Sequence, residues 1–320
     1  MNHSPSHKQI LVTGGYGFVG TNLVKLLVDE GCSVRILDNL SSGTPAYLSD
    51  IPHEFVNGDI RDRSAVDEAV KGIDGIVHLA GHTSVIDSIS DPELDCDINV
   101  RGTLTLLQSC VAHGVSRFVF ASSNAPLGEQ EAPVHEQKVP RPLSPYGASK
   151  LACEGYCSAF HGMHGLGAVV LRFANVYGPY SNLKTSVVAK FIRTILAGDP
   201  LVVYGDGRQT RDFVHVRDIC RGLALALDRG AAGETIGIAS GKETSVIDMV
   251  ETLKAISPRP VTVQFEPERA GEIRRNYSDI TKARNMLGYE PEVDLPDGLA
   301  ECFRWFESEL GYERNGMTYA

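Results

Sequence analysis

The chain has 320 residues, of which 42% are hydrophobic and 22% charged, with 32 Gly and 16 Pro. This composition excludes disordered, collagen-like and mini-protein chains, and the length suits one large domain or two joined ones. Lys and Arg number 30 against 40 Asp and Glu, and the net charge of −10 without a basic run argues against a nucleic-acid or anionic-membrane partner.

Cysteine usage and the N-terminus bear on the compartment. Seven cysteines, spread from Cys32 to Cys302, lack the C-x-x-C pairs of a metal site and do not resemble a secreted disulfide framework. The opening MNHSPSHK has no apolar signal core, and no apolar run approaches the roughly 18–20 residues of a membrane span. We therefore expect a cytoplasmic protein with no metal and no membrane contact.

The first half alternates short apolar runs with longer amphipathic segments. Strands are predicted at 9–13, 33–38, 54–56, 75–80 and 117–123, with helices at 18–30 and 99–112. Such alternation predicts βαβ units in a parallel sheet. The runs 76–80 and 118–121 are apolar on both faces, which indicates that helices cover both sides of the sheet.

The second half begins with an irregular segment. Residues 126–145 hold five of the 16 prolines and predict a loop, after which Ser144 and Pro145 predict a helix start. Beyond an apolar strand at 168–173, helices are expected near 187–196, 216–227, 245–256 and 296–310. We see no linker, so the later residues predict a smaller mixed α/β lobe packed on the sheet.

A glycine-rich turn follows the first predicted strand. The sequence TGGYGFVG places Gly14, Gly17 and Gly20 between strand and helix, where the backbone N–H groups of Phe18 and Val19 can face a pyrophosphate. Asp38 ends the next strand at close to the roughly 20-residue spacing of a carboxylate that binds the adenosine ribose. A carboxylate there would repel a 2′-phosphate, so the pattern favours NAD over NADP. The fold class predicted is a Rossmann-type, doubly wound parallel sheet.

Later strand ends supply further cofactor candidates. The carboxyl ends of strands in such a sheet face the dinucleotide, so adenine and the nicotinamide ribose are expected there. The residues at these edges are Asn39, Asp59, Ile60, Leu79, Ala80 and Gly81.

The segment SPYGASK predicts a catalytic pair. Tyr146 and Lys150 are four residues apart, so they share one face of the predicted helix. An ammonium beside a phenol stabilises the phenolate and is expected to lower its pKa, making Tyr146 a base. Ser123 ends the strand at 117–123 and is expected to reach the same substrate oxygen.

With these motifs the chain resembles the extended short-chain dehydrogenase/reductase family, within it the nucleotide-sugar epimerases, and most closely UDP-glucose 4-epimerases. The resemblance runs from about residue 8 to residue 310. It rests on TGGYGFVG, LDNLSSG, NGDIRD, HLAGHTSV, FVFASS, SPYGASK, LRFANVYGP, RQTRDFVHVRD and GEIRRNYSDITKARNMLGYEP.

The resemblance implies roles for individual residues. Ser123, Tyr146 and Lys150 match the family's catalytic triad, while Tyr146 and Lys150 also contact the cofactor. It further implies that the NAD site includes Asn99, Ser122 and Phe173, and that the sugar-nucleotide site includes Val85, Ser123, Tyr146, Asn175, Val188, Arg211, Arg269, Glu272 and Asn276. Arg211 and Arg269 match arginines that bind the diphosphate, and Glu272 matches an acid at the uridine ribose. A homodimer, joined through a helical bundle that includes the Tyr146 helix, is implied as well.

The reaction that the resemblance implies is epimerisation at C4 of a UDP-sugar. Tyr146 takes the proton of the 4-hydroxyl while the C4 hydride passes to NAD, and the 4-keto sugar takes the hydride back on its other face. Asn124 and Ala125 stand where sugar 4,6-dehydratases carry an acid pair, which disfavours dehydration, and Leu127 replaces the usual Tyr of this segment. Asn276 is small at a position that gates the C2 substituent, so N-acetylhexosamines are expected to fit.

Other readings stay open. Lys184, Arg274 and Arg275 are cations near the expected site and permit a uronate substrate, although surface charge is the simpler interpretation. A UDP-glucuronate 4-epimerase, a dehydratase or decarboxylase of the same family, a dehydrogenase of small alcohols and a non-catalytic NAD-binding sensor are the alternatives. We expect residues 8–175 plus 210–245 to bind NAD, and residues 176–209 plus 246–312 to build the sugar-nucleotide lobe.

Overall fold

The computed structural model describes residues 8–268 and 273–311. Its centre is a seven-stranded sheet, all of whose pairings are parallel. The strands are β1 (Gln9–Thr13), β2 (Ser33–Asp38), β3 (Glu54–Asn57), β4 (Gly75–His78), β5 (Arg117–Ser123), β6 (Gly167–Phe173) and β11 (Thr235–Ile238). They lie in the order β11-β6-β5-β4-β1-β2-β3, which is a doubly wound Rossmann sheet extended by β11. The predicted fold class is confirmed.

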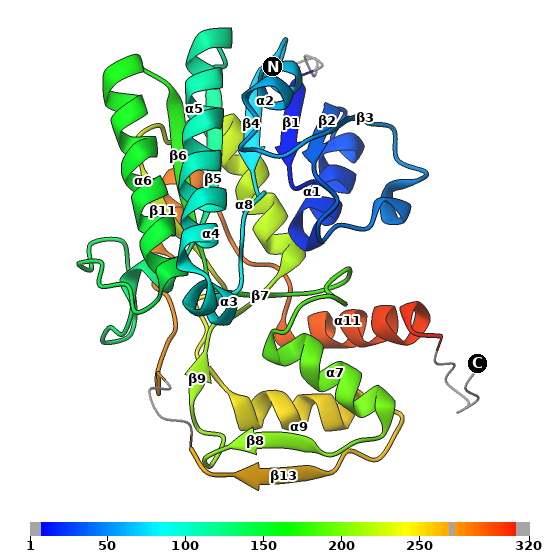
Figure 1. The fold of residues 1–320 in the computed structure, drawn as a ribbon. Coiled ribbons are helices and arrows are strands. Elements are labelled where there is room, and N and C mark those ends of the chain that lie inside the picture. The colour runs from blue at the N-terminus through cyan, green and yellow to red at the C-terminus, as the bar shows by residue number, and fades with distance from the viewer. Residues whose placement is uncertain (1–7, 269–272, 312–320) are drawn as a thin grey trace.

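Helices cover both faces of this sheet (Figure 1). On one face lie α1 (Phe18–Asp29) and α8 (Val216–Arg229), and on the other lie α2 (Arg63–Val70), α5 (Gly102–His113) and α6 (Pro145–His164). Side chains alternate along a strand, so Ile10 and Val12 of β1 join the core under α1 and α8, while Leu11 joins the core under α2, α5 and α6. The continuous apolar runs of the sequence follow from this two-sided burial.

A smaller lobe lies below the sheet in the view of Figure 1. It contains α7 (Val187–Ala197), β8 (Leu201–Tyr204), α9 (Val246–Ile256), β13 (Val263–Glu266) and α11 (Leu295–Glu309). β8 and β13 pair in parallel, and the three helices share a third apolar core. Two short pairings lie between the sheet and this core: β7 (Asn175–Tyr177) with β10 (Phe213–His215), and β9 (Thr210–Arg211) with β12 (Thr244–Ser245).

Several short elements have no counterpart in the predicted pattern. These are η1 (Pro45–Leu48), α3 (Val85–Ser90), α4 (Pro92–Cys96), the π-helical turn η2 (Asp97–Arg101), η3 (Ala125–Leu127) and α10 (Thr281–Leu287). The helix predicted at 99–112 is thus split between η2 and α5. α10 packs on α8 and β11, and Ile280, Ala283 and Leu287 belong to the sheet's core, although the segment 246–312 was expected to build the lobe. The division of the chain into two domains otherwise stays a prediction.

No helix within the described ranges is long and apolar enough to cross a membrane. All seven cysteines are free.

One buried histidine makes the fold sensitive to acid. His78 on β4 is 1% exposed and shares hydrogen bonds with Thr13 Oγ1 at 2.7 Å and Thr103 Oγ1 at 3.0 Å. Burial lowers its pKa to about 3. Since an unfolded histidine titrates near ~6.5, protonation favours the unfolded chain as the pH falls below that value.

We therefore expect the free energy of unfolding to fall by about 2 kcal/mol between pH 7 and pH 5 through His78. Urea unfolding at both pH values checks this. His78→Gln should reduce the pH dependence, whereas His113→Gln, a partly exposed residue of α5, should leave it unchanged. Equal pH dependence in the wild type and His78→Gln would contradict the assignment.

Candidate active site

The turn between β1 and α1 is built around glycines. Gly14 has φ +68°, and a Cβ on it would lie 2.8 Å from the backbone nitrogen of Ala80. A Cβ on Gly20 would lie 2.2 Å from the carbonyl oxygen of Gly14. Gly17 caps α1 without a side chain, so the N–H groups of the first turn, Phe18 and Val19 among them, have no side-chain acceptor from this cap. This turn fits a pyrophosphate, which needs close backbone approach and helix N–H donors.

Asp38 lies at the carboxyl end of β2 and is 8% exposed. Its Oδ2 accepts the N–H of Tyr16 at 3.1 Å, and its Oδ1 accepts the N–H of Leu40 at 2.8 Å. These bonds fix the carboxylate beside the glycine turn, where its remaining lone pairs can accept ribose hydroxyls. The position fits the expected contact with the adenosine ribose of NAD.

Asn39 and Asp59 meet at the ends of β2 and β3. Asn39 Nδ2 donates to Asp59 Oδ2 at 3.0 Å, and the Arg61 guanidinium donates to both oxygens of Asp59 at 2.8 Å. This arginine holds the pKa of Asp59 well below its usual range. Ile60 follows as a buried residue. The carboxylate of Asp59 is thus occupied by protein donors, and its backbone carbonyl accepts the Asp62 N–H at 2.9 Å.

The loop after β4 runs close to the catalytic helix. A Cβ on Gly81 would lie 2.6 Å from Asn99 Oδ1 and 3.8 Å from Lys150 Nζ. Leu79 donates its N–H to the Thr13 carbonyl, and Ala80 donates its own to Thr13 Oγ1. Asn99 is 2% exposed, so its side-chain amide holds this loop from the interior of the protein.

Tyr146, Lys150 and Ser123 come together where α6 starts beside the end of β5. Ser144 caps α6 by accepting the Gly147 N–H at 3.1 Å, as predicted for this helix start. Lys150 Nζ donates to the Ala121 carbonyl at 2.9 Å and lies 5.9 Å from the centre of the Tyr146 ring. Ser123 Oγ accepts the Ala125 N–H at 2.9 Å and also hydrogen-bonds the Tyr146 side chain.

The expected lowering of the Tyr146 pKa is wrong for the protein alone. Burial raises the pKa of Tyr146 to about 12, and the hydrogen bond with Ser123 acts in the opposite direction. Burial also lowers the pKa of Lys150. The sequence placed the two groups on one helix face, but it did not reveal that both are almost fully buried, and burial disfavours both charged forms.

Ser122 and Phe173, expected near the nicotinamide, end β5 and β6. Ser122 Oγ donates to Glu154 Oε1 at 2.6 Å, and Arg172 Nη2 donates to Glu154 Oε2 at 2.6 Å. The Ser122 hydroxyl therefore belongs to a buried ion-pair network. Phe173 is 9% exposed and lies against the sheet's core.

The predicted substrate residues lie in different settings. Val85 is 43% exposed at the start of α3. Asn175 is exposed on β7 and donates from Nδ2 to the Asp212 carbonyl at 3.3 Å. Val188 is 2% exposed and packs in the core of the lobe, so its expected contact with the substrate stays a prediction.

Arg211 donates from Nη1 to the carbonyls of Thr210 and Ile273, both at 2.7 Å. Asn276, three residues after Ile273 in the chain, is half-buried. Arg269 and Glu272 lie outside the described residues.

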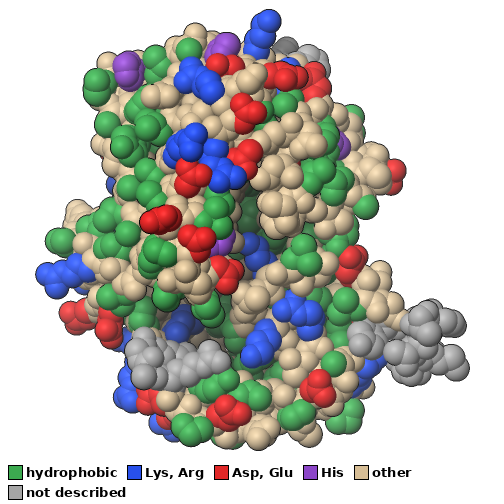
Figure 2. All heavy atoms as spheres, viewed as in Figure 1, with side chains coloured by type: hydrophobic (Ala, Val, Ile, Leu, Met, Phe, Trp, Pro, Cys, Tyr) green, Lys and Arg blue, Asp and Glu red, His purple; other side chains and the backbone are tan. Residues whose placement is uncertain are grey.

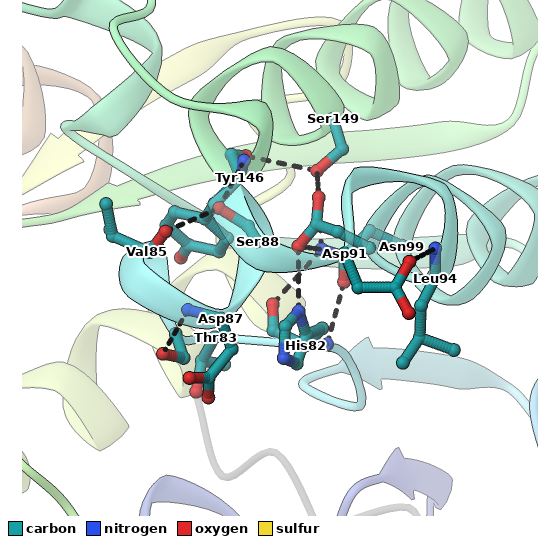
Figure 3. A network of polar contacts seen from close by, with 12 residues as sticks. His82, Thr83, Val85, Asp87, Ser88, Asp91, Leu94, Asn99, Tyr146 and Ser149 are labelled. Carbon is teal, nitrogen blue, oxygen red and sulfur yellow. Dashed lines mark hydrogen bonds and ion pairs between the residues drawn. The ribbon is translucent and has the colours of Figure 1, made fainter.

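Figure 2 shows the face of the molecule hollowed between the sheet and the lobe, with basic side chains and a histidine in and around the hollow. Figure 3 shows Asn99 and Tyr146 together with polar residues that the sequence analysis missed, among them His82 and Ser149. His82 Nδ1 lies 3.0 Å from an oxygen of Asp95, which is fully buried. Asp91 and Pro92, a cap followed by proline, signal a helix that places Asp95 four residues before Asn99. Among the described residues, no group of three or more His, Cys, Asp or Glu is placed to hold a metal ion.

The fold and the site together define an NAD-binding enzyme with a tyrosine and a lysine on one helix. The model of the NAD dependent epimerase/dehydratase family matches residues 10–239, and the chain belongs to this family. Its cofactor is NAD, which the glycine turn and Asp38 fit.

Known relatives include both epimerases and dehydratases. The chain is 38% identical over 306 residues to a putative UDP-glucose 4-epimerase of Methanocaldococcus jannaschii, covering 93% of this chain and 98% of that protein. It is 36% identical over 317 residues to a dTDP-glucose 4,6-dehydratase of Streptomyces niveus, covering 95% and 94%. The solved structure of UDP-glucose 4-epimerase from Thermotoga maritima with UDP-glucose has a TM-score of 0.89 at 36% identity, covering 94% of this chain and 99% of that one.

Proposed function

We propose that this enzyme epimerises a UDP-sugar at C4 through a transient 4-keto sugar. The observation that carries the proposal is the meeting of Tyr146, Lys150 and Ser123 beside a turn that fits NAD. NAD, when bound, accepts a hydride from the sugar and returns it. Tyr146 would take the proton of the 4-hydroxyl, Ser123 would hold the same oxygen, and Lys150 would stabilise the phenolate.

Epimerisation is favoured over 4,6-dehydration by the carboxylates around the triad. Eliminating a hydroxyl from C6 needs a group that donates a proton to it. Asn124 and Ala125, directly after Ser123, carry none. The buried Glu154 accepts hydrogen bonds from Ser122 and Arg172, and the buried Asp95 accepts three others. Protein donors thus occupy both carboxylates.

Proton NMR of the purified protein with each candidate substrate tests the proposal. UDP-glucose, UDP-GlcNAc, UDP-glucuronate and dTDP-glucose are incubated separately, with and without added NAD. The appearance of a C4 epimer from any UDP-sugar supports the proposal. Conversion of dTDP-glucose alone to a 4-keto-6-deoxy sugar would assign the chain to the dehydratases instead.

The nucleotide-sugar contacts are part of the proposal. We assign the diphosphate to Arg211 and Arg269, since two guanidiniums can bind a diphosphate bidentately on a protein of net charge −10. Glu272 is assigned to the uridine ribose, and Asn276 leaves room for an N-acetyl group at C2. We propose a substrate range that includes the UDP-N-acetylhexosamine pair.

Lys184 favours a second candidate, UDP-glucuronate. Its Nζ donates to Thr83 Oγ1 at 2.9 Å, burial lowers its pKa, and no carboxylate in the described part of the chain pairs with it. By contrast, Arg274 pairs with Glu268 and Arg275 with Glu243, so these two are surface charges. A half-buried ammonium with no carboxylate partner among the described residues suits an anionic sugar.

If the substrate is a uronate, Lys184→Met should lower kcat/KM for UDP-glucuronate by about tenfold or more, because it removes a charged hydrogen bond. Its kcat/KM for UDP-glucose should change little. Lys190→Met, an exposed lysine of α7, is the matched control. Equal losses on both substrates would exclude a carboxylate-specific role.

A non-catalytic NAD sensor is the alternative from another class. A sensor would need neither Tyr146 nor Lys150. If the protein turns over a UDP-sugar and a Tyr146 variant loses that turnover, the sensor is excluded.

We also propose a homodimer in the cytoplasm. Large apolar side chains are exposed on α5 and α6, including Val111, Tyr156 and Met163. Such exposure is typical of a helix-mediated interface. Light scattering coupled to size-exclusion chromatography distinguishes a dimer from a monomer.

A further inference from the structure

The loop after β4 carries a histidine held by a buried carboxylate. His82 Nδ1 and Asp95 Oδ1 are 3.0 Å apart, and Asp95 is 0% exposed. Asp95 also accepts Asn99 Nδ2 at 3.1 Å and Ser149 Oγ at 2.6 Å. Three donors from the loop, η2 and α6 thus converge on one carboxylate (Figure 3).

This arrangement fixes the orientation of the imidazole. Asp95 as a carboxylate only accepts, so His82 Nδ1 carries the proton between them and Nε2 is left as an acceptor in the neutral ring. The backbone is held as well, because the His82 N–H donates to Asn99 Oδ1 at 2.9 Å and Asn99 Nδ2 donates to the His82 carbonyl at 3.1 Å. Among the described residues Nε2 has no hydrogen-bond partner, and the side chain is 21% exposed.

His82 lies between two lysines of the site. Its preceding neighbour Gly81 approaches Lys150, since a Cβ there would be 3.8 Å from Lys150 Nζ. The next residue, Thr83, accepts a hydrogen bond from the Lys184 ammonium. A ligand that spans from the catalytic helix to the lobe therefore passes His82.

We propose that His82 is a ligand-contacting residue whose Nε2 accepts a hydrogen bond from a hydroxyl group of the bound nucleotide ligand, with Asp95 as the positioning residue that fixes its tautomer. The hydroxyl belongs to the substrate sugar or to the ribose of NAD. The assignment of a sugar nucleotide as substrate rests on the proposed function.

Asp95 also acts on the catalytic pair through its charge. The charged and titratable groups facing Tyr146 and Lys150 are Glu154, Cys153 and Cys157 of α6, His78 of β4 and Asp95 of α4. Negative charge on Asp95 raises the pKa of Tyr146. Asp95→Asn should therefore shift the acid limb of the kcat/KM profile to lower pH, whereas Ser149→Ala removes a hydrogen bond and keeps the charge.

The direct test is ¹⁵N NMR of His82 in the full-length protein, alone, with NAD, and with UDP-glucose added to the NAD complex. At a pH where the ring is neutral, we expect its proton on Nδ1, and a shift of Nε2 on ligand addition. A shift with NAD alone assigns the hydroxyl to the ribose, and a shift only after UDP-glucose assigns it to the sugar. A proton on Nε2 in the free protein, or no shift with either ligand, would overturn the proposal.

Kinetics give a second readout. His82→Phe should lower kcat/KM by about tenfold, mostly through KM, because it removes one hydrogen bond to the ligand. His113→Gln is the matched control, since His113 pairs with Asp67 on a distant surface. If the wild type epimerises nothing, the proposed function fails while the NMR arm with NAD still decides on His82.

Discussion

Replacing Tyr146 with Phe is expected to lower kcat by about a thousandfold, within the range that general bases contribute. The variant loses the phenolic oxygen that hydrogen-bonds Ser123, while the ring keeps its packing at 9% exposure. Substrate binding should change little, because the phenolic oxygen acts in the transition state, where it takes the proton of the 4-hydroxyl. Initial rates by proton NMR give kcat, and a thermal melt followed by circular dichroism checks that the fold is kept.

Tyr156→Phe serves as the control for this prediction. Tyr156 lies on the same helix, α6, and is 38% exposed away from the triad. It should retain full kcat. Substantial activity in Tyr146→Phe would mean that another group removes the proton.

The second large effect is expected at Gly20. In Gly20→Ala the new Cβ would lie 2.2 Å from the Gly14 carbonyl oxygen and 2.7 Å from Gly15 Cα, and both are backbone atoms that cannot rotate away. The turn must open, which costs roughly 1–3 kcal/mol or more and displaces the N–H groups that face the pyrophosphate. We expect NAD affinity to fall at least about a hundredfold, as measured by calorimetry on protein stripped of cofactor.

Gly162→Ala is the matched comparison. Gly162 is also helical, but a Cβ there meets no atom within 4 Å. Alanine has the better helix propensity, so this variant should be up to about 1 kcal/mol more stable to urea and bind NAD normally. Normal NAD binding by Gly20→Ala would show that the turn does not contact the cofactor closely.

Local signals in the sequence predicted the parts of the site that one segment builds. The glycine turn, Asp38 at the end of β2, and Tyr146 with Lys150 on one face of α6 each depend on spacing within a few residues. The cap at Ser144 followed by Pro145 is equally local, and α6 starts there. The alternation of apolar runs with amphipathic segments was sufficient to predict the parallel sheet.

Features that depend on tertiary contacts escaped the sequence. The packing of α4 against α6 brings Asp95 to Ser149, and the loop after β4 brings His82 to the same carboxylate; no periodicity reports either contact. The raised pKa of Tyr146 follows from burial by several elements, and the burial of Val188 follows from the lobe's core. Residues 281–287 were assigned to the lobe within the segment 246–312, yet the helix α10 that they form packs against α8 and β11.

The core of the lobe has a consequence for synthesis on the ribosome. α7 and β8 contribute to it from residues 187–204, but α11, which covers them together with α9, is complete only at residue 309. The strands β1 to β5 pair over shorter separations and are made first. Since domains fold as the chain emerges, the apolar face of α7 waits about a hundred residues of translation for α11, and that of α9 about fifty. The nascent chain therefore passes through a state with a paired sheet and an open lobe, in which chaperone binding or aggregation competes with closure.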